Sequence, residues 1–593
     1  MRNSNYDKYP ATTVKGDVYV GWEAIRNVLD NCVKWPLAVD CYTGVFENDI
    51  IAALAGIGCK IVRTNDLMLK EAAVREMTAR FMTDDVLFGF VSPLKLIDFF
   101  DADKLARKRR EVAENPEGVI IIGPGATLVS GATVTPAGNP GNQTCYTGNT
   151  PGTLVYADMA RWEIQQRFRR HAVNGLGVNN ASDPVSIQYK RGYFIDWRAL
   201  DAYKETLFDK VGWWLDTNDA AKPKLISGET FRAGMAKTAR KPFRVVPFFD
   251  PAPWGGQWMK EVCDLSRETP NYGWCFDCVP EENSLLLEVG GEKVEFPAND
   301  LVLTHSRELL GAPVEGRFGK DFPIRFDFLD TMGGGNLSLQ VHPTSDYIRK
   351  NFGMNYTQDE SYYMLDAGPD ATVYLGFKTG ADKEAMIADL RESQRTGKPF
   401  EAEKYVNHIP AAKHDHFLIP GGTLHCSGAD SMVLEISATP NLFTFKLWDW
   451  GRMGLDGKPR PINVEHGSHV IQWERNTEYV HANLVNHFEP TVKGEGWSEI
   501  KTGLHPAEFI ETRRTSFTST VPFETLGSVQ VLNLVEGEEA VVESPDGSFE
   551  PFTVHYAETF IIPACVQKFT IRPTGASAGK ECMVVRAFVR FNA

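Results

Sequence analysis

The sequence has few cysteines, no long hydrophobic run and a deficit of positive charge. Ten cysteines in 593 residues are too sparse for a disulfide framework, so we expect a reducing compartment. Residues 1–13 lack the charged and apolar segments of a signal peptide. The longest apolar stretch, 119–129, is interrupted by Gly123, Pro124 and Gly125, which rules out a membrane-spanning helix there. These absences predict a soluble, cytoplasmic protein that makes no membrane contact.

The charge balance limits the partners further. There are 62 Lys and Arg against 77 Asp and Glu, which leaves a formal net charge of −15. Nucleic-acid affinity comes mostly from cations that neutralise phosphates, so we expect no nucleic-acid partner. A small anionic substrate needs only a local cluster of cations and stays compatible with this charge. At roughly 150 residues per domain, the length predicts three or four domains.

The first part of the chain alternates apolar runs with helical patterns. Candidate strands lie at 35–40, 86–91, 119–122 and 154–157, and helical segments at 48–55, 70–80 and 160–170. Strands separated by helices indicate an α/β domain with a parallel sheet.

From about residue 243 the pattern becomes β-rich. Short alternating runs recur at 284–289, 293–296, 336–341, 372–376, 416–419, 432–436 and 441–448, followed by a last block at 509–590. Many short strands at regular spacing are typical of a sandwich or barrel. A helical pattern at 383–395 interrupts them as an insertion.

One strand of this part carries polar residues on a single face. In the segment NLSLQVH, Ser338, Gln340 and His342 alternate with apolar residues, so they either line a cavity or face solvent. Together with Glu360 and His425, Gln340 and His342 offer the donor types that suit a zinc-like ion with an open position. Spacing alone does not decide, because 13 histidines allow many chance combinations.

Several motifs in order give a stronger signal. They are LSLQVHP at 337–343, ESYYMLDAG at 360–368, VYLGFK at 373–378, FLIPGGTLH at 417–425 and LWDWGRMGLDGKPRP at 447–461. This series resembles the type I mannose-6-phosphate isomerases, which are metal-dependent enzymes on a cupin fold. The resemblance implies a mainly-β double cupin (jelly roll): a metal-binding cupin at 231–480 with a helical insertion at about 380–400, and a second cupin at 481–593. FIIPACV at 560–566 occupies the place of FLIPGGTLH without its His, so the second cupin is expected to lack ligands.

The resemblance also implies an activity and a site. The activity is the interconversion of mannose 6-phosphate and fructose 6-phosphate, or of a related sugar phosphate, by proton transfer through a cis-enediol. One Zn²⁺ per chain is expected, and a homo-oligomer is left open. The implied metal ligands are Gln340, His342, Glu360 and His425, the substrate-binding residues are Ser338, Lys446 and Arg452, and the catalytic residues are Lys446 and His342.

Two positions depart from the pattern of the bacterial family members. Gln358 stands where they carry Lys, two residues before the ligand Glu, and Lys446 stands where they carry Arg. Lysine keeps the positive charge but lacks the bidentate fork of arginine. An alternative is therefore a non-catalytic sugar-phosphate-binding or regulatory protein that retains the zinc site.

The front part resembles uridine-kinase-like proteins, so residues 1–230 are predicted to form a degenerate kinase-like α/β domain with a P-loop ancestry. The resemblance is carried by GVIIIGPGATLV at 118–129 and LVYADMARWEIQQRFRR at 154–170. The strand PLAVD and the following CYTGVFEND occupy the place of a phosphate loop, but Glu47 stands where the lysine should be. A carboxylate repels a triphosphate, which argues against a second alternative, a bifunctional protein with nucleoside or sugar kinase activity. The arginines of 161–170 either hold an anion or belong to an exposed helix.

Two smaller patterns allow metal chemistry as well. His414 and His416 flank Asp415 and would share one strand face, which makes a second metal conceivable. Cys275 and Cys278 form a single CxxC, which is weak evidence for zinc or redox chemistry without a second pair.

Overall fold

The computed structural model describes residues 4–58, 60–131, 152–440, 442–453, 462–503 and 505–591. The chain forms two compact units that interrupt each other in sequence. The α/β unit comprises residues 11–238 and 284–304, and the β unit comprises 1–10, 239–283 and 305–593. Within the described ranges, no helix has both the length and the apolar composition that crossing a bilayer requires.

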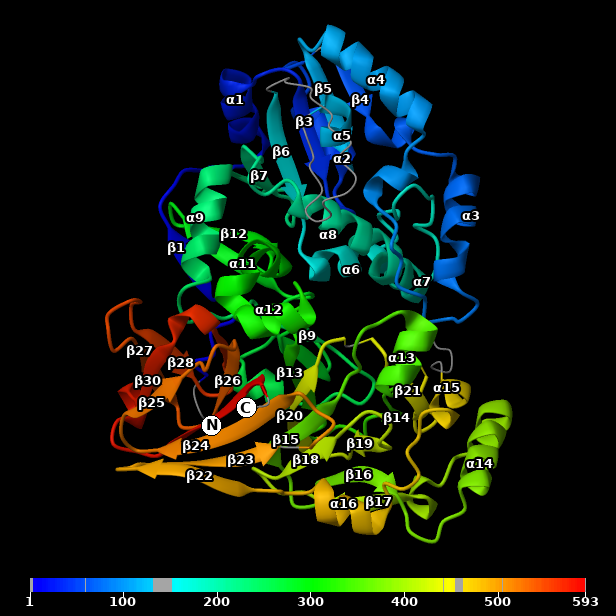
Figure 1. Cartoon of the computed structure of the whole chain (residues 1–593), viewed down its shortest axis with the longest axis vertical. Coiled ribbons are helices and arrows are strands. Elements are labelled where there is room, and N and C mark those ends of the chain that lie inside the picture. The colour runs from blue at the N-terminus through cyan, green and yellow to red at the C-terminus, as the bar shows by residue number, and fades with distance from the viewer. Residues whose placement is uncertain are drawn as a thin grey trace. The chain divides into compact units, whose positions relative to one another are not determined.

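A seven-stranded sheet forms the centre of the α/β unit (Figure 1). Its order is β2-β8-β7-β6-β3-β5-β4, with parallel pairing from β7 to β4 and antiparallel pairing of β8 with β7 and β2. The strands are β2 (Val18–Val20), β3 (Leu37–Cys41), β4 (Lys60–Arg63), β5 (Val119–Gly123), β6 (Thr153–Asp158), β7 (Trp213–Asp216) and β8 (Lys224–Ser227). The predicted parallel α/β sheet is confirmed.

Helices connect these strands and pack against the sheet. They are α1 (Trp22–Cys32), α2 (Glu47–Ala53), α3 (Glu71–Met82), α4 (Ala102–Glu114), α5 (Ala126–Ser130), α6 (Arg161–Arg169), α7 (Val185–Arg191), α8 (Trp197–Glu205) and α9 (Gly228–Thr238). The core between them is aliphatic, with Leu37, Val39, Ile120, Ile122 and Val155 at most 2% exposed. Burial of both faces explains why these strands read as continuous apolar runs.

The strand predicted at 86–91 is not formed. Val86 is 61% exposed, and the backbone N–H groups of Leu87 and Phe88 donate to the side chain of Asp85. Such a side-chain turn gives the backbone an alternative to a sheet ladder. Gly89 then passes so close to the carbonyl oxygen of Phe81 that a Cβ there would lie 2.6 Å from it.

The chain leaves the β unit after residue 283 and returns to the α/β unit for residues 284–304. There β11 (Ser284–Val289) pairs with β12 (Glu292–Pro297) and runs parallel to β1 (Ala11–Val14). We expected these two strands among those of the cupin, and the structure corrects this. The alternating pattern identifies a strand, but the sheet that it joins depends on a partner far away in the chain.

The returning segment also supplies one member of a buried ion cluster. Lys204 Nζ lies 2.6 Å from Asp158 Oδ2 and 2.5 Å from Asp300 Oδ1, and no side chain of the three is more than 1% exposed. Burial lowers the pKa of Lys204, but the two carboxylates outweigh burial and raise it overall. Asp300 opens α11 (Asn299–Leu310), so the end of the returning segment is tied to α8 and β6.

Two antiparallel sheets face each other in the first sandwich of the β unit. The six-stranded sheet contains β18 (His416–Ile419), β15 (Glu360–Ala367), β20 (Ser431–Ala438), β13 (Ile324–Asp330), β10 (Trp274–Cys278) and β9 (Phe248–Asp250) in this order. The five-stranded sheet contains β17 (Val406–Pro410), β16 (Thr372–Phe377), β19 (His425–Ser427), β14 (Leu339–Val341) and β21 (Phe445–Trp448).

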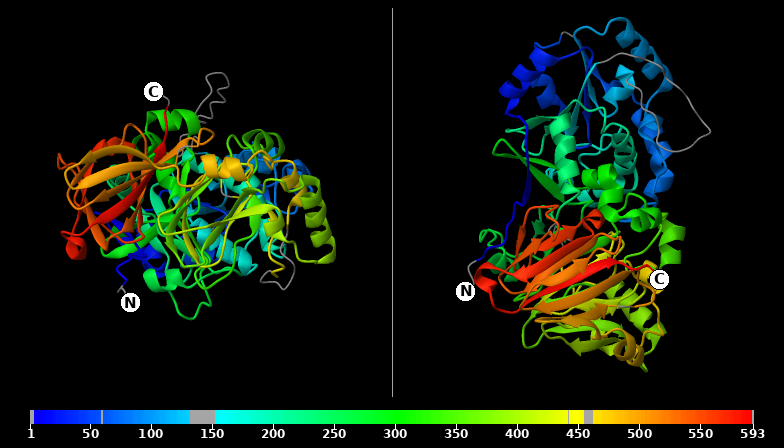
Figure 2. Two further views of the ribbon diagram at one scale, coloured as in Figure 1. Left: turned by 90° about the horizontal axis from the view of Figure 1, so that it is seen from below. Right: turned by 60° about the vertical axis from the view of Figure 1, so that its left-hand side comes forward.

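A second sandwich follows, and its strands, orange to red, lie beside those of the first in both views of Figure 2. One sheet contains β22 (Glu489–Gly494), β23 (Trp497–Gly503), β24 (Ile510–Phe517), β31 (Cys582–Val589), β26 (Gln530–Glu536) and β29 (Thr559–Ile562). The other contains β25 (Val521–Glu524), β30 (Lys568–Pro573), β27 (Glu539–Glu543) and β28 (Phe552–His555). One apolar core joins the two sheets, with Phe517, Leu532, Val542, Phe569 and Val584 almost fully buried. The predicted mainly-β architecture is confirmed.

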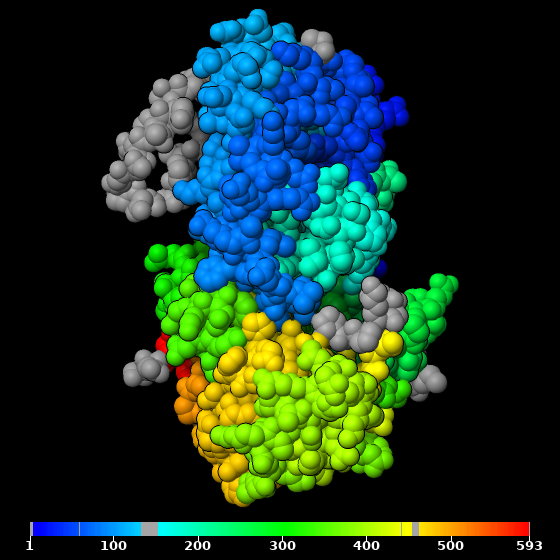
Figure 3. Space-filling view, turned by 90° about the vertical axis from the view of Figure 1, so that its right-hand side faces the viewer, coloured from blue at the N-terminus to red at the C-terminus, as the bar shows by residue number. Residues whose placement is uncertain are grey.

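Helices of the β unit lie between and outside the strands. They are α10 (Trp258–Val262), the end of α11, α12 (Ala312–Phe318), α13 (Ser345–Phe352), α14 (Lys383–Thr396), α15 (Val464–Ser468) and α16 (Thr477–Asn483). The predicted helical insertion is α14, on the face that Figure 3 turns toward the viewer. Asp382 caps it by accepting a hydrogen bond from the N–H of Ala385, and Gly397 ends it with a φ of +74°.

Candidate metal centre

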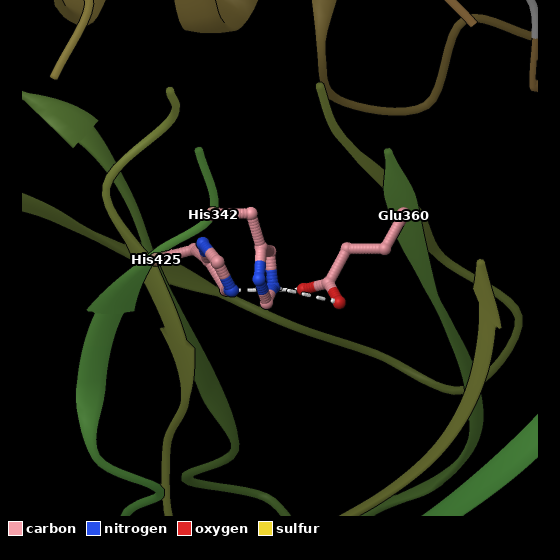
Figure 4. Close-up of side chains that lie close together, drawn as sticks. All are labelled: His342, Glu360 and His425. Carbon is pink, nitrogen blue, oxygen red and sulfur yellow. Dashed lines mark ion pairs between the residues drawn. The ribbon is translucent and has the colours of Figure 1, made fainter. Parts of the chain in front are cut away.

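Strands of both sheets of the first sandwich bring four predicted residues together. Gln340 on β14 stands directly opposite His425 on β19, and His342 follows β14 by one residue. Glu360 is the first residue of β15 in the facing sheet. Its Oε1 lies 2.8 Å from His425 Nε2, and its Oε2 lies 3.0 Å from His342 Nε2 (Figure 4). The three side chains are at most 1% exposed, so the cluster is closed from solvent.

Backbone carbonyls fix the orientation of both imidazoles. His342 Nδ1 lies 3.0 Å from the carbonyl oxygen of Phe443, and His425 Nδ1 lies 2.9 Å from that of Thr423. A carbonyl only accepts, so each Nδ1 donates to its carbonyl oxygen and each Nε2 faces Glu360. Such a backbone contact is the usual support of a metal-binding histidine.

The two Nε2 atoms and the carboxylate of Glu360 face one another away from solvent, so this cluster requires a positive charge. His342 Nε2 and Glu360 Oε1 are fully buried and have no hydrogen bond of correct geometry with a described residue. Burial opposes both charges, yet the pKa of Glu360 is held well below its usual value by His342 and His425, and Glu360 raises the pKa of His342. Either a proton or a cation satisfies these atoms, and in the described ranges this is the one group of three such donors close enough to share a metal.

Gln340 is the fourth predicted ligand. Its Nε2 lies 3.2 Å from His425 Nε2, and the side chain is 8% exposed. The two ends of an amide are interchangeable in placement, so a half-turn presents Oε1 to the same point. The structure therefore brings all four predicted ligands to one place.

The predicted substrate residues lie around this cluster. Lys446 on β21 stands opposite Gln340, on the side away from His425, so both side chains belong to the same face of the sheet. Ser338 Oγ donates to Asp449 Oδ1 across 3.0 Å, and Arg452 Nη2 donates to the same oxygen, also across 3.0 Å. Asp449 thus links Ser338 and Arg452. Sequence reasoning missed it, although its place in LWDWG marked it.

Further hydrogen bonds connect Glu360 to neighbouring polar side chains. Gln358 Nε2 donates to Glu360 Oε2 at 3.0 Å and to Glu435 Oε1 at 3.3 Å. Ser437 Oγ also donates to Glu435. Burial and the charge of Glu360 raise the pKa of Glu435 to about 7. Glu435, on β20, was not singled out from the sequence, because nothing in its spacing distinguishes it from a strand residue facing solvent.

The smaller predicted patterns form no metal-binding group among the described residues. His414 Nδ1 is bonded to the hydroxyl of Tyr363, and His416 is 0% exposed with its pKa lowered to about 3 by burial. Asp415 accepts from the N–H of Ala412 and fills the turn before β18. Cys275 and Cys278 are buried thiols of β10 and join no metal-binding group of described residues. Residues 454–461 of the motif at 447–461 lie outside the described residues.

Known proteins are similar to parts of this chain. The probable mannose-6-phosphate isomerase GmuF of Bacillus subtilis is 23% identical over 333 residues, covering 56% of this chain and 96% of the relative. Over that part, the chain is homologous to mannose-6-phosphate isomerases. A family model described as a domain of unknown function, DUF8485, matches residues 21–240.

Solved structures are also similar over part of the chain. The mannose 6-phosphate isomerase from Bacillus subtilis has a TM-score of 0.47 and 18% identity, and the match covers 58% of this chain and 99% of that one. A zinc-bound mannose 6-phosphate isomerase has a TM-score of 0.45 and 14% identity, covering 59% of this chain and 100% of that one.

Proposed function

We propose that the β unit is a zinc-dependent aldose–ketose isomerase that interconverts mannose 6-phosphate and fructose 6-phosphate, or a related sugar phosphate. The observation that carries this proposal is the convergence of His342, Glu360 and His425, whose donor atoms lie within 4.8 Å of one another. Homology to mannose-6-phosphate isomerases supports the substrate class. The 333 aligned residues exceed the length of the chain before residue 240, so the homology extends into the β unit.

The donor set fits a single zinc ion. Two neutral imidazoles, one carboxylate and one amide oxygen would hold it, and this set leaves a coordination position for substrate. The residues would be Gln340, His342, Glu360 and His425. When bound, zinc supplies Lewis-acid polarisation of the sugar oxygens at C1 and C2.

The residues that would contact the substrate have separate roles in this proposal. Lys446, beside Gln340, would stabilise the negative charge that develops on the enediol oxygens while a proton moves between C2 and C1. Ser338 and Arg452 would contact the phosphate group. Their shared bonds to Asp449 hold both side chains in position before substrate arrives.

The rest of the chain is assigned in the same proposal. Residues 231–480 form the metal-binding cupin, apart from the segment that returns to the α/β unit, and 481–593 form a second cupin without ligands. Residues 1–230 form a kinase-like domain without phosphoryl transfer. This proposal is supported by the parallel pairing of β3 with β5 and β6, and by Glu47, the first residue of α2 after β3.

The test combines metal analysis with an assay of C2 proton exchange on several hexose and pentose phosphates. Stripping the full chain with a chelator is expected to abolish exchange, and zinc is expected to restore it. His342→Ala is expected to lose both bound zinc and activity. His408→Ala is the matched control, because His408 is an exposed residue of the same sheet that is bonded to Thr372. A zinc-loaded protein that exchanges no C2 proton would contradict the isomerase and favour the binding protein.

A further inference from the structure

A cavity of about 530 Å³ lies in the α/β unit, beyond the carboxyl end of β3. It is lined by residues 42–49, by Arg63 at the end of β4, by Asn65 after β4, by Pro124 after β5, and by the loop 172–177. After β3, the chain places β4 and β5 on one side of that strand, and then β6 and β7 on the other side. Such a switch of direction is where open α/β sheets bind ligands, and the volume suits a small molecule.

Thr43 and Glu47 belong to the lining and have no side-chain partner among the described residues. Thr43 is only 6% exposed, and its hydroxyl makes no hydrogen bond to a described residue. The carboxylate of half-buried Glu47 likewise has no hydrogen bond or ion pair in the described part of the chain. Burial raises the pKa of Glu47 although Arg63 opposes this. Neither the Thr43 hydroxyl nor the Glu47 carboxylate is among the buried polar atoms that lack a partner, so water reaches both, and the hydroxyl groups of a ligand would take the place of that water.

The walls of the cavity do not suit a phosphate. The backbone N–H groups of Tyr42, Val45 and Glu47 already donate to carbonyl oxygens, at 2.9, 3.3 and 3.1 Å. A phosphate loop needs such groups directed at its ligand. The charged side chains of the lining are Glu47, Asp49 and Arg63, so negative charge is in excess.

The arginine-rich helix α6 does not supply a compensating cation. Arg167 is 1% exposed, donates to the carbonyl oxygen of Gly44 at 2.8 Å, and pairs with Glu163 at 2.9 Å. Its guanidinium also stacks on the ring of Phe46, 3.9 Å from the ring centre. Arg167 therefore packs against the loop that contains Gly44 and Phe46. This corrects both expectations for Arg167, an anion-binding role and an exposed position.

We propose that this cavity binds an uncharged sugar ring through a vicinal diol. The two oxygens of Glu47 accept the two hydroxyl groups, since an ionised carboxylate accepts on both oxygens and such bonds are the strong ones. Thr43 bonds a third hydroxyl. Arg63 is held toward the cavity by its bond to Asn48 Oδ1 at 2.9 Å and donates to a ring or hydroxyl oxygen.

Two kinds of molecule carry this diol. One is a free hexose, and the other is a ribonucleoside with its 2′- and 3′-hydroxyls. Tyr42 and Phe46, also in the lining, offer apolar surface to a ring in either case. The proposal is independent of the isomerase reaction, because every lining residue belongs to the α/β unit.

The test measures binding to the full chain by titration calorimetry and saturation-transfer NMR. The probes are D-mannose, adenosine, 2′-deoxyadenosine and ATP. Mannose or adenosine is expected to bind, and binding should weaken at least about tenfold in Glu47→Gln and in Thr43→Val. Glu76→Gln, which neutralises an exposed carboxylate of α3 outside the lining, should bind as the wild type does. Loss of binding with 2′-deoxyadenosine identifies the ribose as the source of the diol, and binding of mannose alone identifies a hexose.

Stability separates a binding role of Glu47 from a structural one. Glu47→Gln keeps the shape of the side chain and removes an uncompensated charge, so its unfolding temperature is expected to equal or exceed that of the wild type. A variant that loses binding together with stability would contradict the proposal. Tighter binding of ATP than of adenosine would overturn it, and so would no binding of mannose or adenosine up to about 10 mM.

Discussion

Gln358 donates its side-chain amide to Oε2 of Glu360 across 3.0 Å. The same nitrogen reaches Glu435, so one glutamine spans a proposed metal ligand and a second buried carboxyl group. A carboxylate that is held in this way keeps its oxygens directed at the two histidines. Gln358 therefore has a positioning role in place of the charge that a lysine would supply.

Replacement of Gln358 tests this positioning role. Gln358→Leu removes both hydrogen bonds and is expected to lower zinc affinity by about 10- to 100-fold, the usual effect of losing a residue that orients a ligand. Competition with a chromophoric chelator measures the affinity. Ser361→Ala is the control, because Ser361 donates only to the carbonyl oxygen of Ile436. Equal zinc affinity in both variants would contradict the prediction.

Lys446 is expected to act on turnover more than on binding. Lys446→Met removes the cation beside Gln340, so kcat for mannose 6-phosphate should fall by about 10²- to 10³-fold with a smaller change in KM. Lys446→Arg should retain most of the activity, since it keeps the charge. Lys350→Met, at an exposed position of α13, is the control. Unchanged kcat in Lys446→Met would show that the cation is not needed.

The buried cluster around Lys204 predicts a large effect on stability. Lys204→Met leaves two buried carboxylates without their cation, which is expected to destabilise the α/β unit by about 3–5 kcal/mol. Lys222→Met breaks the exposed pair with Glu292 and should cost at most about 1 kcal/mol. Calorimetric unfolding of the full chain compares the two. Similar transition temperatures for both variants would rule out the cluster as a major contribution.

Glu295 predicts a pH dependence of stability in the same unit. Glu295 is half-buried, and its carboxyl group lies near Asp216 and accepts hydrogen bonds from Trp162 and Ser284. Removal from water, followed by the charge of Asp216, raises the pKa of this carboxyl group to about 7. The native state therefore holds a proton that the unfolded chain releases near its ordinary pKa. The stability from this proton is fully present below about pH 4.5 and is lost as the pH rises through 7.

Glu295→Gln removes this dependence. At pH 8 the variant is expected to be more stable than the wild type by roughly 2–3 kcal/mol, and at pH 5 the difference should be small. Denaturant midpoints at the two pH values measure it. Glu292→Gln, a change in the same strand at a more exposed side chain, should show no such gain. A gain of equal size at both pH values would contradict the assigned cause.

The sequence allowed the local chemistry to be predicted better than the long-range pairing. Alternation placed Gln340 and His342 on one face, and the ordered motifs added Glu360 and His425. Those four positions lie on or next to three strands, β14, β15 and β19, and each belongs to a short motif that a linear pattern carries. Asp449 acts through bonds to Ser338 and Arg452 that no spacing reveals.

The remaining errors have the same origin. An apolar run at 86–91 is typical of a strand, but the side chain of Asp85 competes for its backbone N–H groups. The strand at 284–289 was expected in the wrong sheet, because its partner β1 lies near the N-terminus, more than 250 residues earlier in the chain. Arg167 was expected either to hold an anion or to lie on an exposed helix, since nothing local indicates that Gly44 and Phe46 enclose it.

The interleaving of the two units has a consequence for biosynthesis. The α/β unit lacks β11, β12 and the second carboxylate for Lys204 until residue 300 has left the ribosome. Residues 1–10 reach their final contacts later still, because they belong to the β unit, where the hydroxyl of Tyr6 donates to Asp277. The final strand of that unit ends at Val589. Neither unit can complete its fold in simple N-to-C order, so a nascent chain holds unfinished surfaces of both units at once. Cutting the gene near codon 240 would not release a finished domain from either side.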